Sequence, residues 1–191
     1  MSRYWCLSFD SDAPQPWNLG EAHYPDGQEY WSGMYAVRST RRLAPGERMT
    51  VEVTHPGRRL DFWVSSFGVP VATRVFGEAI VSVAGDDVEL LPASAGHEHD
   101  MVVLHPRRAI RCVDQTRSKF TLFLENDPVR PDLAGEYSWI IKLVLDRSSI
   151  PADAHSFIVH GSSKVIVSER MRDAILGGPH VGVRLTEVEV A

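Results

Sequence analysis

The segment Gly96-His97-Glu98-His99-Asp100 holds the residue types best suited to chemistry in this chain. Imidazole nitrogens and carboxylate oxygens are metal ligands, and two histidines in a His-x-His pair on a strand could both reach one ion. The segment follows Pro92-Ala93-Ser94-Ala95 and lies between two predicted strands, where polar loop residues are also expected. Two interpretations stand, a solvated loop and a small metal-dependent enzyme that uses residues 97–100. We favour the loop.

Other catalytic signatures are missing from the sequence. It contains no Gly-x-Gly-x-x-Gly, no Gly-x-x-x-x-Gly-Lys-Ser/Thr, no Gly-x-Ser-x-Gly and no His-Glu-x-x-His. Asp114 and Ser118 could serve as an acid–base pair, but we favour a turn in which Asp114 accepts backbone N–H groups. No arrangement of these residues supports naming a reaction, and we expect no catalytic residues, no cofactor and no bound metal.

Composition and charge narrow the class of protein. The chain has 191 residues, and its 20 Lys plus Arg against 25 Asp plus Glu give a net charge of −5. This mild acidity argues against direct nucleic-acid binding, which depends on clustered cations. The two cysteines, Cys6 and Cys112, are too few for a disulfide framework. An acidic residue, Asp10, interrupts the N-terminus before a signal-peptide core could form, and no apolar run approaches the ~20 residues of a membrane span. We expect a cytoplasmic protein without membrane partners.

Hydrophobic periodicity predicts an α+β fold with a mostly antiparallel or mixed sheet. Apolar residues at spacings of three to four, with Thr73 and Ser168 as N-caps, predict two principal helices near residues 71–84 and 168–177. Alternating or short apolar runs predict strands around residues 49–54, 60–64, 88–91, 101–104, 119–124 and 139–145.

An internal repeat accounts for much of this pattern. Shifting Leu60–Ala93 by 95 residues places it without a gap on His155–Val188. Both copies follow the plan strand, turn, capped helix, glycine turn, strand, and Phe76 aligns with Met171. Two copies are too few for a solenoid. We therefore expect two pseudo-equivalent lobes, about 60–93 and 155–188, with Phe76 and Met171 both facing a core.

The N-terminal region differs from the rest of the chain. Eight of the 17 aromatic residues fall within the first 35 positions, among prolines and glycines and without a sustained helical or strand period. We predict an irregular, aromatic-rich arm over residues 1–44, packed on an α+β domain over residues 45–191. The rings of this arm either cover one side of the core or anchor a partner.

The order of several short motifs resembles a known family. The motifs are Leu60-Asp61-Phe62-Trp63, Val69-Pro70-Val71-Ala72-Thr73-Arg74, Arg111-Cys112-Val113-Asp114-Gln115-Thr116-Arg117-Ser118, Phe157-Ile158-Val159, Ile166-Val167-Ser168-Glu169-Arg170-Met171 and Gly182-Val183-Arg184-Leu185. In this order and spacing, across residues 45–191, the chain resembles the myxobacterial-type immunity-protein domain family. That family, formerly a domain of unknown function, belongs to polymorphic and contact-dependent toxin systems.

The resemblance implies a non-enzymatic protein that binds and neutralises a cognate bacterial toxin in the cytosol. The toxins paired with such domains are diverse and include nucleases, and the contact would be with the C-terminal toxin domain. Residue types point to two sets of contact residues, because large rings bury area at little entropic cost and carboxylates steer a basic partner. These sets are the aromatic Trp17, Tyr30 and Trp31 and the acidic Asp86, Asp87 and Glu89.

Overall fold

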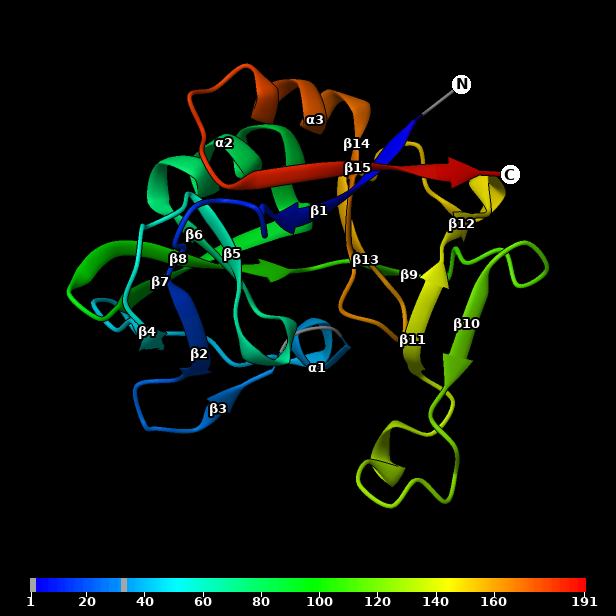
Figure 1. The fold of residues 1–191 in the computed structure, drawn as a ribbon, viewed down its shortest axis with the longest axis horizontal. Coiled ribbons are helices and arrows are strands. Elements are labelled where there is room, and N and C mark those ends of the chain that lie inside the picture. The colour runs from blue at the N-terminus through cyan, green and yellow to red at the C-terminus, as the bar shows by residue number, and fades with distance from the viewer. Residues whose placement is uncertain (1–2, 32–33) are drawn as a thin grey trace.

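The computed structural model describes residues 3–31 and 34–191. Across these residues the chain forms three α-helices and three β-sheets, two of them large (Figure 1). The sheets contain both antiparallel and parallel pairs, so the predicted α+β class with mixed sheets is confirmed. No helix within the described ranges is long and apolar enough to cross a membrane.

The seven-stranded sheet lies mostly in the first half of the chain. In spatial order its strands are β3 (Glu29–Tyr30), β2 (Asn18–His23), β4 (Met49–His55), β7 (Val88–Ala95), β8 (Glu98–Pro106), β6 (Pro70–Thr73) and β5 (Phe62–Val64). The six-stranded sheet has the order β12 (Val144–Leu145), β15 (Val183–Val190), β1 (Tyr4–Phe9), β14 (Val165–Ser168), β13 (Ser156–Val159) and β9 (Ala109–Ile110). The strands β10 (Lys119–Leu122) and β11 (Tyr137–Lys142) form a separate two-stranded sheet.

Local capping explains where the two principal helices begin. The helix α2 (Arg74–Ala84) begins after Thr73, whose hydroxyl accepts a hydrogen bond from the Phe76 N–H at 3.4 Å. The helix α3 (Glu169–Leu176) begins after Ser168, whose hydroxyl accepts from the Met171 N–H at 3.3 Å. Each cap satisfies a backbone donor that the helix leaves unpaired. The first helix, predicted near residues 71–84 with Thr73 as its cap, begins at Arg74, because β6 continues through Thr73. A further short helix, α1 (Met34–Arg38), was not predicted.

The 95-residue repeat is present in the structure. The elements β5, β6, α2 and β7 recur at that offset as β13, β14, α3 and β15. Phe76 and Met171 are both fully buried and belong to one hydrophobic cluster together with Ile80 and Ile175, which lie at the next equivalent pair of positions. In Figure 1 the two helices lie together above the sheets, and contacts between them confirm that they are neighbours. The prediction that both residues face a core is confirmed.

Each half of the chain, taken as residues 1–96 and 97–191, contributes its first strand to the large sheet that the other half mainly forms. The strand β1 lies between β14 and β15, so that Trp5 has Val167 on one side and Glu187 on the other. The strand β8 lies between β6 and β7 in the same way, with Val103 beside both Val71 and Leu91. Each large sheet therefore contains one internal strand that comes from the other half of the chain.

The expectation of an irregular arm over residues 1–44 is wrong. This region supplies β1 to the interior of one sheet and β2 and β3 to the other. The strand signal of β1 is only six residues long, and its burial alternates imperfectly. The local composition is dominated by Pro14 and Pro16, which connect β1 to β2, and by Pro25 and Gly27, which lie in the turn between β2 and β3.

Candidate functional site

The most distinctive surface feature is the hairpin, defined here as residues 119–142. It consists of β10, β11 and their connection, which includes a 3-10 turn at Pro131–Leu133, and it extends away from both large sheets (Figure 1). Within the described part of the chain, β10 and β11 pair only with each other. One backbone hydrogen bond, from the Tyr137 N–H to the Gly161 carbonyl at 2.9 Å, ties the start of β11 to the body.

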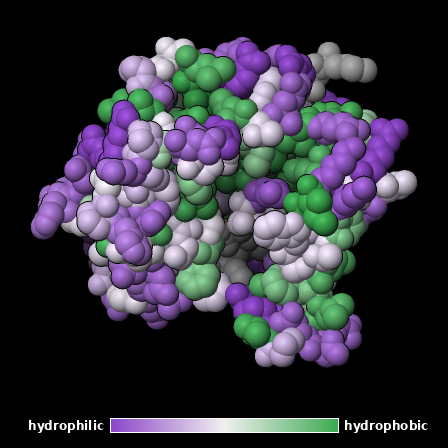
Figure 2. All heavy atoms as spheres, viewed as in Figure 1, coloured by the Kyte–Doolittle hydropathy of each residue, from purple (hydrophilic) through white to green (hydrophobic). Residues whose placement is uncertain are grey.

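Apolar side chains are concentrated on this hairpin. Among the described residues nine large hydrophobic side chains are exposed, and the hairpin carries Leu122, Leu124, Val129, Trp139 and Ile141. Trp139 is 68% exposed and Ile141 is 69% exposed. They stand two residues apart on β11, and an irregularity of the β10–β11 ladder lies beside Ile141. We call the surface that these two side chains expose the apolar face of the hairpin. Figure 2 shows apolar surface along this part of the molecule.

Cations lie beside the apolar face. A groove between β11 and the turn that joins β13 to β14 has a volume of about 230 Å³ and is lined by Trp139, Ser162 and Lys164, among others. Lys119 and Lys142 face each other across the β10–β11 ladder, and Lys142 also pairs with Glu189 at 2.7 Å. Because Glu189 pairs with Lys142, Lys119 and Lys164 are the cations that most affect the potential beside the apolar face.

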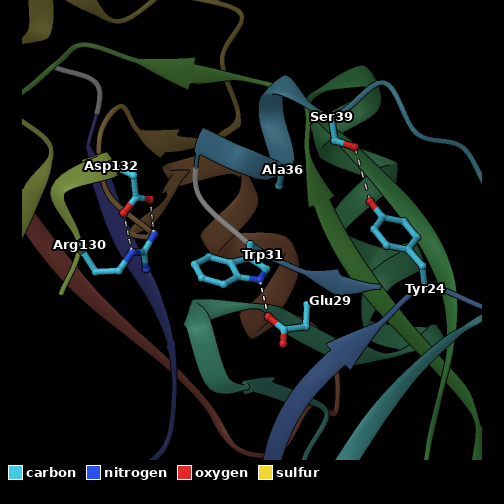
Figure 3. A pocket seen from close by; sticks show the side chains of 7 residues that line it. All are labelled: Tyr24, Glu29, Trp31, Ala36, Ser39, Arg130 and Asp132. Carbon is cyan, nitrogen blue, oxygen red and sulfur yellow. Dashed lines mark hydrogen bonds and ion pairs between the residues drawn. The ribbon is translucent and has the colours of Figure 1, made fainter. Parts of the chain in front are cut away.

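A second cavity lies where the hairpin tip approaches the N-terminal region (Figure 3). It measures about 360 Å³ and is lined by Tyr24, Glu29, Trp31, Ala36, Ser39, Arg130 and Asp132. The Trp31 ring stacks on Phe67 at 4.6 Å, and the Arg130 guanidinium lies 4.6 Å from the centre of the Trp31 ring. The Trp31 indole N–H donates to the Glu29 carboxylate at 2.8 Å. Trp31 thus connects β3, the turn before β6 and the hairpin.

Two of the three predicted aromatic contacts lie in the core. Trp17 and Tyr30 are buried in the cluster beneath the seven-stranded sheet, and Tyr30 is only 1% exposed. Their rings cover the core and are not available as surface anchors, so this part of the predicted contact set is wrong. Trp31 is half-buried and is engaged by the contacts described above.

The predicted acidic contacts do not form an acidic surface. Asp86 is exposed, whereas Asp87 is buried and pairs with Arg108 at 2.9 Å. The Asp87 carboxylate also accepts backbone hydrogen bonds from His155 and Ser156 at 2.8 and 3.1 Å, which join the end of α2 to β13. Asp87 therefore has a structural role.

Glu89 is also engaged within the protein. Its carboxylate lies 3.3 Å from the Arg107 guanidinium, close enough for an ion pair. The prediction that Asp87 and Glu89 help to steer a basic partner is therefore wrong, because internal arginines already pair with both carboxylates.

The segment 96–100 is the turn and first part of the β7–β8 hairpin. Glu98 pairs with Arg59 at 2.6 Å, and Asp100 pairs with Arg74 at 2.8 Å. The His99 imidazole lies 3.2 Å from the Ser94 hydroxyl. Within the described ranges these residues do not bring three ligand atoms together.

A different set of side chains could hold a metal ion. Among the described residues, Glu21, His23 and Glu29 are the one group of three whose ligand atoms lie within 4.8 Å of one another. Glu21 and His23 share a face of β2, and Glu29 of β3 lies opposite His23 in the ladder. Glu29 also accepts the Trp31 N–H, so it has a structural partner as well. Sequence reasoning missed this group because Glu29 comes close to Glu21 and His23 through the pairing of β3 with β2.

Asp114 and Ser118 form the expected turn. The Asp114 carboxylate accepts from the backbone N–H groups of Thr116 and Arg117 at 2.9 and 3.0 Å. The Ser118 hydroxyl donates to the Val144 carbonyl at 3.1 Å and accepts from the Val144 N–H at 3.0 Å. Nearby, burial raises the pKa of the Cys112 thiol to about 12, so this thiol is protonated and unreactive at neutral pH. The contacts of Asp114 and Ser118 therefore stabilise the turn.

Sequence reasoning also missed the exposed hairpin. The runs 119–124 and 139–145 predict strands, but a continuous apolar run is equally typical of a strand buried inside a sheet. Exposure depends on whether other strands lie on either side. The sequence of the hairpin alone contains no signal for that.

Comparison with known proteins leaves the family open. No protein-family model matches the chain, and no curated protein matches it. Function is therefore inferred from the surfaces that the chain itself presents.

Proposed function

We propose that this protein is an immunity protein, which binds a cognate bacterial toxin in the cytosol and neutralises it without chemistry of its own. The observation that carries the proposal is the exposed apolar face of the hairpin, centred on Trp139 and Ile141. A soluble chain rarely leaves a cluster of large apolar side chains in water unless another molecule covers it. The resemblance of residues 45–191 to an immunity-protein family supports the same function.

The energetics of such a contact favour Trp139 as its centre. Neutralising a toxin calls for nanomolar affinity or better, about −12 kcal/mol. Most of that free energy usually comes from a few large side chains that become fully buried, and tryptophan is prominent among them. Trp139 is mostly exposed in the free protein, so its burial would remove a large apolar area from water.

The backbone of the hairpin offers a second means of binding. Across the described residues, β10 and β11 do not pair with either large sheet. A two-stranded sheet is marginally stable alone, and an edge strand can pair with a strand of a partner. We therefore propose that the toxin adds to the hairpin edge while its apolar side chains cover Trp139 and Ile141.

Charge indicates what kind of surface the toxin presents. Lys119 and Lys164 lie beside the apolar face, whereas Lys142 is already paired with Glu189. An interface is favoured when opposite potentials meet, and rim charges act mainly on the rate of association. The proposed partner surface is therefore apolar at its centre and acidic at its rim, in place of the basic partner expected from sequence.

The test is co-expression with the toxin encoded beside this protein, with growth as the measure of protection and gel filtration as the measure of binding. Trp139→Ala and Ile141→Ala should each reduce protection and complex formation. Leu176→Ala is the matched control, because Leu176 is 65% exposed on α3, away from the hairpin. Thermal melting of each variant verifies folding.

Two results would contradict the proposal in different ways. If the wild-type protein neither binds nor protects, the immunity function is wrong. If the wild type protects and folded Trp139→Ala protects equally well, the function stands but the hairpin is not the contact surface.

A further inference from the structure

A cationic cleft lies between the body of the protein and the part of the hairpin where the β10–β11 ladder meets its connection. Its volume is about 560 Å³, and its lining includes Arg38, Arg111, Tyr137 and His160. Ile110 of β9 lies opposite Val159 of β13, and the His160 N–H donates to the Ile110 carbonyl at 2.9 Å. Arg111 and His160 therefore leave neighbouring strands side by side.

A third basic group joins this pair from a different element. Arg38 is the last residue of α1, and its side chain lines the same cleft. The pKa of His160 is lowered first by burial and then by the positive charges of Arg111 and Arg38. The cleft thus gathers two guanidinium groups around an imidazole.

In the part of the chain that the structure describes, these two guanidinium groups have no acidic partner. Among the described residues neither Arg38 nor Arg111 has an ion pair or a side-chain hydrogen bond, although the chain has more acidic than basic residues. Glu136 also lines the cleft, but it forms no ion pair with either arginine. Both arginines are exposed, so water screens their mutual repulsion, but an anion bound in the cleft would interact favourably with both.

A neutral hydrogen-bond donor, the Tyr137 hydroxyl, also lines the cleft. The Tyr137 hydroxyl accepts a hydrogen bond from the Gln115 side-chain amide at 2.7 Å, which leaves its own proton available to a ligand. The Tyr137 ring is held edge-on against Phe120, with 5.0 Å between the ring centres. The donor is therefore positioned before any ligand arrives.

We propose that this cleft binds a small phosphate-bearing molecule, with Arg38 and Arg111 on the phosphate oxygens and the Tyr137 hydroxyl as an additional donor. Guanidinium groups donate in pairs to oxyanions, and a phosphate offers more acceptor oxygens than a carboxylate does. The volume falls within the range of small-molecule sites. Trp139 and Ile141, the centre of the proposed toxin surface, do not line this cleft, although Leu122 of the hairpin does.

Isothermal titration of the wild-type protein with inorganic pyrophosphate, at constant ionic strength, tests this site. We expect saturable binding that Arg38→Gln and Arg111→Gln each weaken about tenfold or more, as expected for the loss of a charge-assisted hydrogen bond. Arg170→Gln is the matched control, since Arg170 is exposed on α3 and its loss changes the net charge equally. A rise in melting temperature with pyrophosphate, absent in Arg111→Gln, should accompany binding.

Malonate and a single-stranded oligonucleotide complete the experiment. Equal affinity for malonate would overturn the assignment to phosphate, and tighter binding of the oligonucleotide through the same arginines would overturn the assignment to a small molecule. The site itself is wrong if pyrophosphate shows no saturable binding, or if Arg170→Gln weakens binding as much as Arg111→Gln.

Discussion

The Tyr30 hydroxyl lies 2.8 Å from Nδ1 of His105, and both side chains are buried. This contact joins β3, at one edge of the seven-stranded sheet, to β8 in its interior. Burial raises the pKa of Tyr30 and lowers the pKa of His105 below its usual value of 6.5. Both groups are therefore uncharged at neutral pH, and protonation of His105 opposes folding.

The lowered pKa of His105 predicts a loss of stability in mild acid. The unfolded chain takes up the proton at higher pH than the folded chain does. The contribution of neutral His105 to the free energy of unfolding is therefore fully present above about pH 6.5. It falls as the pH drops toward the pKa of His105 in the folded protein. Melting temperatures from pH 8 to pH 5 should fall, and His105→Asn should reduce that fall. An unchanged slope in His105→Asn would contradict this assignment.

The repeat predicts that truncating Phe76 or Met171 lowers the free energy of unfolding by similar amounts. Phe76→Ala and Met171→Ala should each lower the free energy of unfolding by about 2–5 kcal/mol, because both remove a fully buried side chain. Val75→Ala is the control, since Val75 is 63% exposed on α2 and its loss should cost less than about 0.5 kcal/mol. Urea unfolding measures all three. A small cost at either buried position would show a core that repacks around the gap.

The exchange of strands predicts that neither half folds alone. Fragment 97–191 lacks β1, which separates β14 from β15, and fragment 1–96 lacks β8, which separates β6 from β7. Each fragment alone should give the circular dichroism of an unfolded chain, whereas an equimolar mixture should recover a cooperative thermal transition. A cooperative transition of 97–191 by itself would contradict the structural dependence between the halves.

Local signals account for what the sequence could predict. The caps at Thr73 and Ser168 and the apolar spacing that follows them lie within a few residues, so α2 and α3 are predictable. The place of β1 is not, because Trp5 pairs with residues near the opposite end of the chain. The candidate surface escaped prediction for the same reason, since the exposure of Trp139 depends on which strands lie nearby.

The burial of Asp87 predicts that its side chain contributes more to stability than that of its exposed neighbour, Asp86. Asp87→Asn should destabilise the protein by about 1–3 kcal/mol, because it weakens the bonds to Arg108 and to the backbone of His155 and Ser156. Asp86→Asn should stay within about 0.5 kcal/mol, because Asp86 is exposed. Chemical denaturation compares the two variants. Equal effects would mean that the Asp87 contacts contribute nothing beyond a surface charge.

Trp31 provides the last prediction, because it connects the hairpin tip to the body. Trp31→Ala removes the stack on Phe67 and the contact with the Arg130 guanidinium. The tip should then open more often, so amides of residues 126–134 should exchange hydrogen faster while those of β8 remain protected. Trp139→Ala is the control, since it removes an exposed ring and should leave exchange at the tip unchanged.

The same two variants distinguish a residue that positions the hairpin from a residue that contacts the toxin. If the hairpin binds the toxin, Trp31→Ala should slow association, because the tip is less often in its bound position, and Trp139→Ala should speed dissociation. Surface plasmon resonance with immobilised toxin measures both rates. Unchanged amide exchange in Trp31→Ala would show that other contacts hold the tip in place, and Trp31 would then have no part in positioning the hairpin.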